Sequence, residues 1–129
     1  MTSRSLLSVF AFVPLAAGSA WAHHNMSAMF DFNQVVTRTG TLAELDWRNP
    51  HIYILVDVAT GGQAERWSFE GPPPGFFRSR NVDKPAFEAS LGKSVTVEAS
   101  RARNGSQSGL IRQVTLSDGT VVSACPQNC

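Results

Sequence analysis

The chain has 129 residues, 43% of them hydrophobic and 16% charged, with 11 lysines and arginines against 10 aspartates and glutamates. This length suits a single domain with one modest core. A net charge of +1, with no basic stripe, argues against a nucleic-acid-binding protein and against electrostatic attachment to an anionic membrane surface.

Residues 1–22 have the three parts of a cleavable signal peptide. Arg4 gives a positive start, the stretch from Leu6 to Ala17 is almost wholly apolar, and Ala20 and Ala22 form the small-x-small pattern that signal peptidase reads. No later apolar run is long enough to anchor the chain in a membrane. We therefore expect export to the periplasm, with secretion as the alternative, and a mature chain that starts at His23.

The first strand is expected after an irregular N-terminal segment, residues 23–34, which packs Phe30 and Phe32 onto the domain. Alternating threonines predict a strand from Val35 to Trp47. Gly40 lies in the middle of this strand, where glycine usually marks a bulge or sharp bend, and the apolar phase shifts soon after it.

The clearest strand follows the turn-forming pair Asn49-Pro50. Its apolar side chains fall on every second residue, which is the pattern of a strand with one face in the core. They are Ile52, Ile54, Val56 and Val58. Gly61-Gly62 then predicts a hairpin turn into a third strand at residues 66–69.

A proline- and glycine-rich stretch at residues 71–75 interrupts the sheet pattern. It predicts a short helical turn from Pro74 to Ser79 and a second helix that is capped by Asp83 and ends at Gly92. Further strands are expected at residues 94–99 and 110–116, and a turn at Asp118-Gly119 leads into a return segment at 120–123.

This order of elements predicts a mainly β protein. Three strands, a short helical crossover and two or three further strands are typical of a small five-stranded Greek-key barrel of the oligonucleotide/oligosaccharide-binding (OB) type, with a short helix between strands 3 and 4. The barrel domain would span residues 35–124. A small sandwich or another open barrel is the alternative.

Both cysteines, Cys125 and Cys129, lie in the C-terminal tail, residues 125–129. In an oxidising compartment a disulfide between them is the default expectation. A loop of three residues stabilises a fold very little, so a redox, metal-binding or intermolecular role stays open as the alternative.

Several segments match a recurring pattern: Ala22-His23-His24, Met29-Phe30-Asp31, Gly40-Thr41-Leu42, Trp47-Arg48-Asn49-Pro50-His51, residues 92–97 and residues 116–119. Together they resemble a family of small exported proteobacterial proteins classed as a domain of unknown function, whose mature chains begin near His-His-Ser and carry a W-x-N-P-H motif. Asn25 replaces that serine here, and the cysteine tail departs from the family pattern. The resemblance implies an exported domain without an established activity. The layout is more distantly similar to periplasmic bacterial OB-fold proteins.

The histidines suggest a metal site. An N-terminal histidine chelates a metal through its α-amine and its imidazole, copper favours such nitrogen donors, and Met26 and Met29 add thioethers suited to Cu(I). If the N-terminal arm folds over the barrel, His51 would complete the site with His23 or His24. Alternatively, the terminal histidines are simply solvated, the methionines are hydrophobic anchors and His51 is a hydrogen-bonded structural residue.

The function favoured by the sequence is binding of an envelope protein or a small ligand. The alternative is binding of copper, or of another late transition metal, by the histidines and methionines. The predicted ligand or partner face carries Trp47, Asn49, Tyr53 and Trp67, although these aromatics could equally fill the barrel. An acid/base enzyme built on Glu44, Asp46 and His51 is the third hypothesis. No phosphate loop, nucleophile elbow or paired zinc-ligand motif supports it, so no catalytic residue is assigned.

Overall fold

The computed structural model describes residues 25–125. The predicted signal peptide, His23, His24 and Cys129 lie outside this range, and what was inferred for them stays a prediction. Within the described range, no helix is long and apolar enough to cross a membrane.

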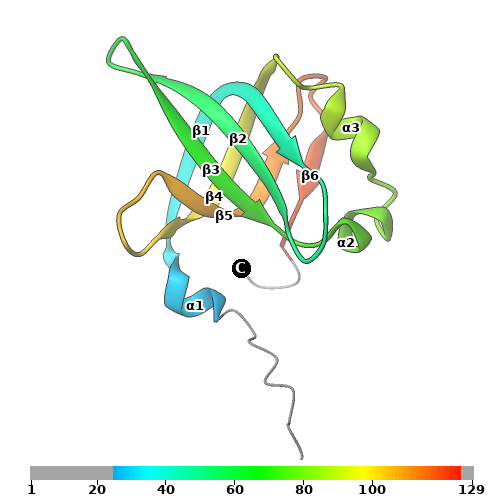
Figure 1. The fold of residues 1–129 in the computed structure, drawn as a ribbon, viewed down its shortest axis with the longest axis horizontal. Coiled ribbons are helices and arrows are strands. Elements are labelled where there is room, and N and C mark those ends of the chain that lie inside the picture. Colours follow the sequence, from blue (N-terminus) through cyan, green and yellow to red (C-terminus); the bar gives the residue numbers. More distant parts are fainter. Residues whose placement is uncertain (1–24, 126–129) are drawn as a thin grey trace, which may run out of the picture.

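The described chain is mainly β, with six strands and three short helices (Figure 1). The strands are β1 (Phe30–Asp46), β2 (Ile52–Thr60), β3 (Gln63–Gly71), β4 (Ser94–Ala102), β5 (Ser108–Thr115) and β6 (Val121–Ser123). The helices are α1 (Met26–Met29), α2 (Pro74–Arg78) and α3 (Lys84–Glu88). The helical crossover therefore lies between β3 and β4, as predicted.

The strand pairings close on themselves. Neighbours in the order β3-β2-β1-β4-β5-β6 are antiparallel, and β3 also pairs in parallel with β5. Each of the strands β1 to β5 thus has two neighbours in a closed circuit, which gives the sheet an inner and an outer face (Figure 1). The return segment after Asp118-Gly119 forms the short β6, which pairs with β5 alone. It makes the count six rather than the expected five.

The inner face holds the core. The alternation predicted for β2 is confirmed, since Ile52, Ile54 and Val56 are fully buried. Residues of the other strands complete the same cluster, among them Phe69, Val97 and Ile111. Removing each such side chain from water contributes about 1.5–3 kcal/mol, so this face supplies the main driving force for the fold.

The N-terminal segment differs from the prediction. Residues 26–29 form a helical turn, and β1 begins at Phe30 rather than at Val35. Phe30 is buried opposite Ala102 of β4. Arg103 holds α1 in place, because its backbone N–H donates to Met29 O at 2.9 Å and its side chain donates to Ser27 O at 2.9 Å. These partners are distant in sequence, so local patterning does not reveal them.

The expected bulge lies at Ala43 and not at Gly40. The β1–β2 register shifts between Leu42 and Glu44. Gly40 is required for another reason: a Cβ atom there would overlap the carbonyl oxygen of Asp57, because β1 crosses β2 at close range. Glycine at this position allows one strand to pair with both β2 and β4.

The crossover helices cover one region of the core with an aromatic cluster, defined as Trp47, Phe76, Phe77 and Phe87. The Trp47 ring lies 5.4 Å from Phe77 and 5.2 Å from Phe87, between ring centroids. Asp83 caps α3 as predicted, since its side chain accepts a hydrogen bond from Lys84 N. The helix ends at Glu88, before Gly92.

Candidate functional site

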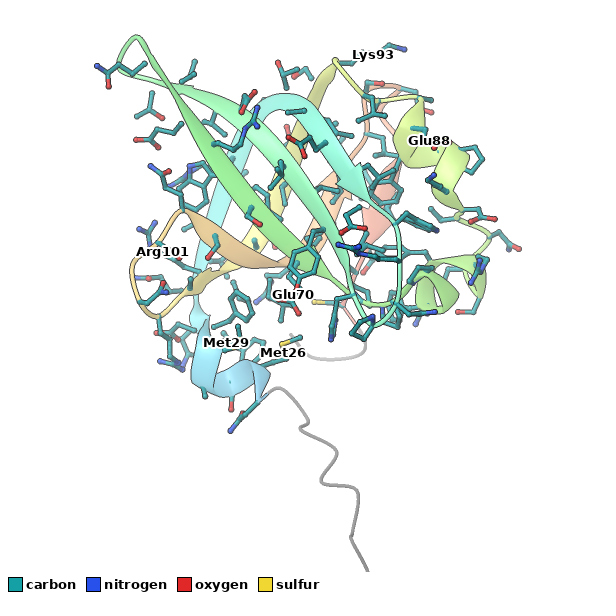
Figure 2. All side chains as sticks on the ribbon, in the orientation of Figure 1. Met26, Met29, Glu70, Glu88, Lys93 and Arg101 are labelled. Atoms are coloured by element: carbon teal, nitrogen blue, oxygen red, sulfur yellow. The ribbon has the colours of Figure 1, made fainter. Side chains whose placement is uncertain are left out.

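Tyr53 lies between two carboxylates on the outer face. The strand register places it opposite Asp46 of β1 and opposite Glu70 of β3. Tyr53 is 38% exposed, whereas Glu70 is only 8% exposed. Directly opposite side chains in a sheet lie about 5 Å apart at Cβ, so the phenol and the two carboxylates form one row. The Glu70 end of this row is labelled in Figure 2.

His51 joins this row where β2 begins. Its Nδ1 atom lies 3.2 Å from Gly71 O and 3.4 Å from Glu70 Oε1. Because a carbonyl oxygen can only accept, the bond to Gly71 requires a hydrogen on Nδ1, which leaves Nε2 as the acceptor of a neutral ring. Among the described residues, no lysine or arginine lies within ion-pair distance of Glu70, so His51 is its nearest ionisable nitrogen partner.

The environment shifts the ionisation of Tyr53. Burial raises the pKa of its phenol above the ordinary value of 10.0, and the charge and hydrogen bonding of Glu70 raise it further, followed by the charge of Asp46. Each effect disfavours the phenolate. The folded state therefore keeps the phenol proton to a higher pH than the unfolded state does. The stability linked to this proton is complete below pH 10 and is lost as the pH rises through the folded pKa.

We predict that Glu70→Gln lowers the pKa of Tyr53 toward its ordinary value without reaching it, because burial remains. The sequence contains a single tyrosine, so an absorbance titration of phenolate reports Tyr53 alone. Glu44→Gln is the matched control, since Glu44 is not among the groups that shift this pKa. An identical titration curve in Glu70→Gln and the native protein would contradict the assigned contact.

A shallow groove of about 210 Å³ lies beside this row. It is lined by Glu44, Leu45, Asp46, Tyr53, Leu55 and Ser68, from β1, β2 and β3. The lining combines carboxylates, a phenol and a hydroxyl with an apolar floor. Such a mixture suits a ligand that offers an apolar surface to the ring and hydrogen-bond donors or positive charge to the carboxylates.

Arginines partly neutralise the groove. Arg66 donates to both carboxylate oxygens of Asp57, at 2.7 and 2.9 Å, and to Glu44 at 3.2 Å. This hydrogen bonding holds the pKa of Asp57 below its ordinary value of 3.8. Arg48 lies 2.7 Å from Asp46. All these groups are solvent-exposed or nearly so, and the pairs fix side-chain positions more than they stabilise the fold.

The structure separates the four residues predicted for a binding face. Tyr53 lies in the groove, and Asn49 is exposed in the turn before β2, joined to Pro50 by a cis peptide bond. Trp47 packs in the aromatic cluster, where its Nε1 is buried without a hydrogen-bond partner among the described residues. Trp67 is 2% exposed on the inner face, so it does not contribute to the outer groove.

Of the predicted metal ligands, Met26, Met29 and His51 lie within the described residues, whereas His23 and His24 do not. Met26 and Met29 lie on α1 (Figure 2), and His51 immediately precedes β2. Within residues 25–125, no group of three or more His, Cys, Asp or Glu side chains is close enough to hold a metal ion. Cys125 is disulfide-bonded; since Cys129 is outside the range, its pairing stays a prediction.

Glu70 is the site residue that the sequence reasoning missed. The predicted third strand ends at Phe69 and the proline-rich break begins at Gly71, so Glu70 is assigned to neither. Extending the alternation of this strand by one residue puts Glu70 on the same face as Ser68, opposite Tyr53 of β2. The hairpin turn at Gly61-Gly62 sets the register of the two strands, so the pairing of Tyr53 with Glu70 follows from the number of residues between them.

A model of a family of unknown function, DUF6152, matches residues 12–113 of the chain. The chain belongs to this family. The DUF6152 match includes every residue that lines the groove, together with His51 and Glu70, and it ends within β5, before β6 and Cys125. No curated protein and no solved structure matches the chain.

Proposed function

We propose that this DUF6152 protein is an exported, non-enzymatic binding protein of the periplasm, which holds a protein partner or a small ligand in the groove beside Tyr53. Export rests on the signal-peptide pattern of residues 1–22. The groove is the single observation that carries the binding function, because it joins a half-exposed aromatic ring to several hydrogen-bonding groups on one face.

The proposed architecture is an OB-like barrel with β6 added to its fifth strand. Three features support it: the closed circuit β1-β2-β3-β5-β4, the long β1 shared by two neighbours, and the helical crossover between β3 and β4. Proteins of this fold commonly bind ligands on the face of their second and third strands. The groove lies on the corresponding strands, and this analogy of fold adds to the argument from its chemistry.

The binding function is preferred to catalysis because the carboxylates of the groove are already engaged. Arg66 holds Glu44 and Arg48 holds Asp46, so neither is positioned as a free general base. A hydrolytic or acid/base enzyme that uses His51 and Glu70 is the weaker alternative, since the hydroxyl beside them is the Tyr53 phenol, whose raised pKa disfavours the phenolate that would act as a nucleophile.

The test is crosslinking in intact cells that export the protein, followed by its recovery from the periplasm. We expect a reproducible crosslinked partner, or a copurifying small molecule seen by native mass spectrometry. Tyr53→Ala should abolish it. Val121→Ala is the matched control, because Val121 is also an exposed apolar side chain but lies on β6, outside the groove lining.

Circular dichroism of each variant would show that the fold is retained. Recovery of the same partner from Tyr53→Ala and the native protein would contradict a role for the groove, and so would the absence of any partner or ligand from both.

Copper binding is the second candidate, favoured by one observation. Metal-binding histidines usually donate their second ring nitrogen to a carbonyl or carboxylate, and His51 Nδ1 does this to Gly71 O beside Glu70. The other ligands would be His23 or His24, with Met26 or Met29. A chain starting at His23 that binds Cu(II) no better than its His23→Ala, His24→Ala variant would contradict this candidate.

A further inference from the structure

Two arginines from different strands converge on Trp67. Arg38 of β1 places its guanidinium carbon 4.3 Å from the centre of the indole ring, and Arg101 of β4 places its own at 5.5 Å. Together these contacts put the two positive charges within about 10 Å of each other, roughly one Debye length at 0.1 M salt. Figure 2 shows Arg101 on the side of the molecule away from α3.

Neither guanidinium has a carboxylate partner in the part of the chain that the structure describes. Arg38 donates to Thr37 O at 2.8 Å, and Arg101 donates to Gly105 O at 3.2 Å. A guanidinium has five N–H donors, so most donors of both groups face no protein acceptor. By contrast, each of the other arginines on the strands and their loops has a carboxylate within 4 Å: Arg48, Arg66, Arg103 and Arg112.

We propose that Arg38 and Arg101 form an anion-binding site over Trp67, for a ligand that carries a small oxyanion group such as a phosphate, sulfate or carboxylate. Stacking on the buried indole holds both guanidinium groups in place before the ligand arrives, which lowers the entropy cost of binding. The planar fork of arginine matches the paired oxygens of such anions. This site is separate from the groove beside Tyr53 and does not depend on it.

Glu65 sets the boundary of the proposed site. Its carboxylate accepts a hydrogen bond from Trp67 Nε1 at 3.3 Å, and within the described range it forms no ion pair with either arginine. The indole edge near Glu65 therefore disfavours an anion, which we expect to bind at the guanidinium groups instead. A single anion between them would neutralise the like charges that the fold has brought together.

The test follows the indole N–H signal of Trp67 by NMR in the folded protein, during titration with inorganic phosphate, sulfate or acetate at constant ionic strength held with chloride. We expect a saturable shift with at least one of the three anions. Arg38→Gln or Arg101→Gln should each weaken binding at least tenfold, and the double variant should abolish saturation. Arg80→Gln is the matched control, because Arg80 also stacks on an aromatic ring, that of Phe76, at 3.6 Å.

Arg38→Lys and Arg101→Lys keep the charge, and they provide folded comparisons if the glutamine variants do not fold. A loss of affinity in these lysine variants would support recognition by the arginine forks. The proposal would be overturned by a shift that grows linearly with all three anions, by saturation that persists in the double variant, or by lysine variants that bind as well as the native protein.

Discussion

Gly40→Ala is expected to lower the free energy of unfolding by about 2–4 kcal/mol, a large effect for the addition of one methyl group. The new Cβ would overlap the carbonyl oxygen of Asp57 and would lie 2.9 Å from its carbonyl carbon. Both are backbone atoms of β2, held by the pairing of Asp57 with Thr41 and Arg66. The strand therefore cannot move aside without losing hydrogen bonds.

Urea denaturation followed by circular dichroism measures this loss. Gly75→Ala is the control, because no atom lies within 4 Å of a Cβ at that position, which is in α2. Alanine there should be neutral or should add up to about 1 kcal/mol of stability. Equal unfolding midpoints for the two alanine variants would show that β1 does not pass β2 as closely as described.

Phe87→Ala is expected to cost about 3–5 kcal/mol of unfolding free energy, the usual range for emptying a buried phenylalanine site. Phe87 is fully buried, with its ring centroid 5.2 Å from that of Trp47 and 5.6 Å from that of Phe77. A cavity would remain because the neighbouring Trp47 and Phe77 rings can only partly relax into the emptied space. Thermal unfolding monitored by circular dichroism measures this loss.

Phe76→Ala provides the comparison for this loss. Phe76 belongs to the same aromatic cluster but is only partly buried, and its contact with Phe77 is edge-on at 5.5 Å. Its removal should cost about 1 kcal/mol, in proportion to the smaller apolar area it buries. A cost at Phe76 as large as that at Phe87 would contradict the expectation that the loss follows the apolar area each ring buries.

The parts of the fold that depend on local patterns could be predicted from the sequence. The alternation at Ile52 to Val58 reports which face of a strand is buried, and Asp83 reports a helix start, because both signals involve neighbouring residues. The turn at Gly61-Gly62 is also local: both residues have positive φ, of 57° and 83°, which glycine adopts without strain.

The remaining features depend on which distant segments meet. The close approach that requires Gly40, and the contacts of Arg38 and Arg101 with one indole, arise only when β1 and β4 join the other strands. Trp67 was assigned to a ligand face for its residue type, although it shares its strand face with Phe69 and is buried with it. Alternation within the strand was the better guide than aromatic character.

The closed circuit of strands also limits how this protein can meet other chains. An open sheet offers rows of unpaired backbone groups that recruit further strands and promote aggregation. Here the described edges without a second strand partner are the short β6, β3 before Ser68, β1 before Thr41 on the side of β2, and β2 after Asp57 on the side of β1. The circuit still pairs each of β1 to β5 on both sides along part of its length, so we expect the proposed partner to be recognised mainly through side chains, and such recognition is sensitive to single substitutions.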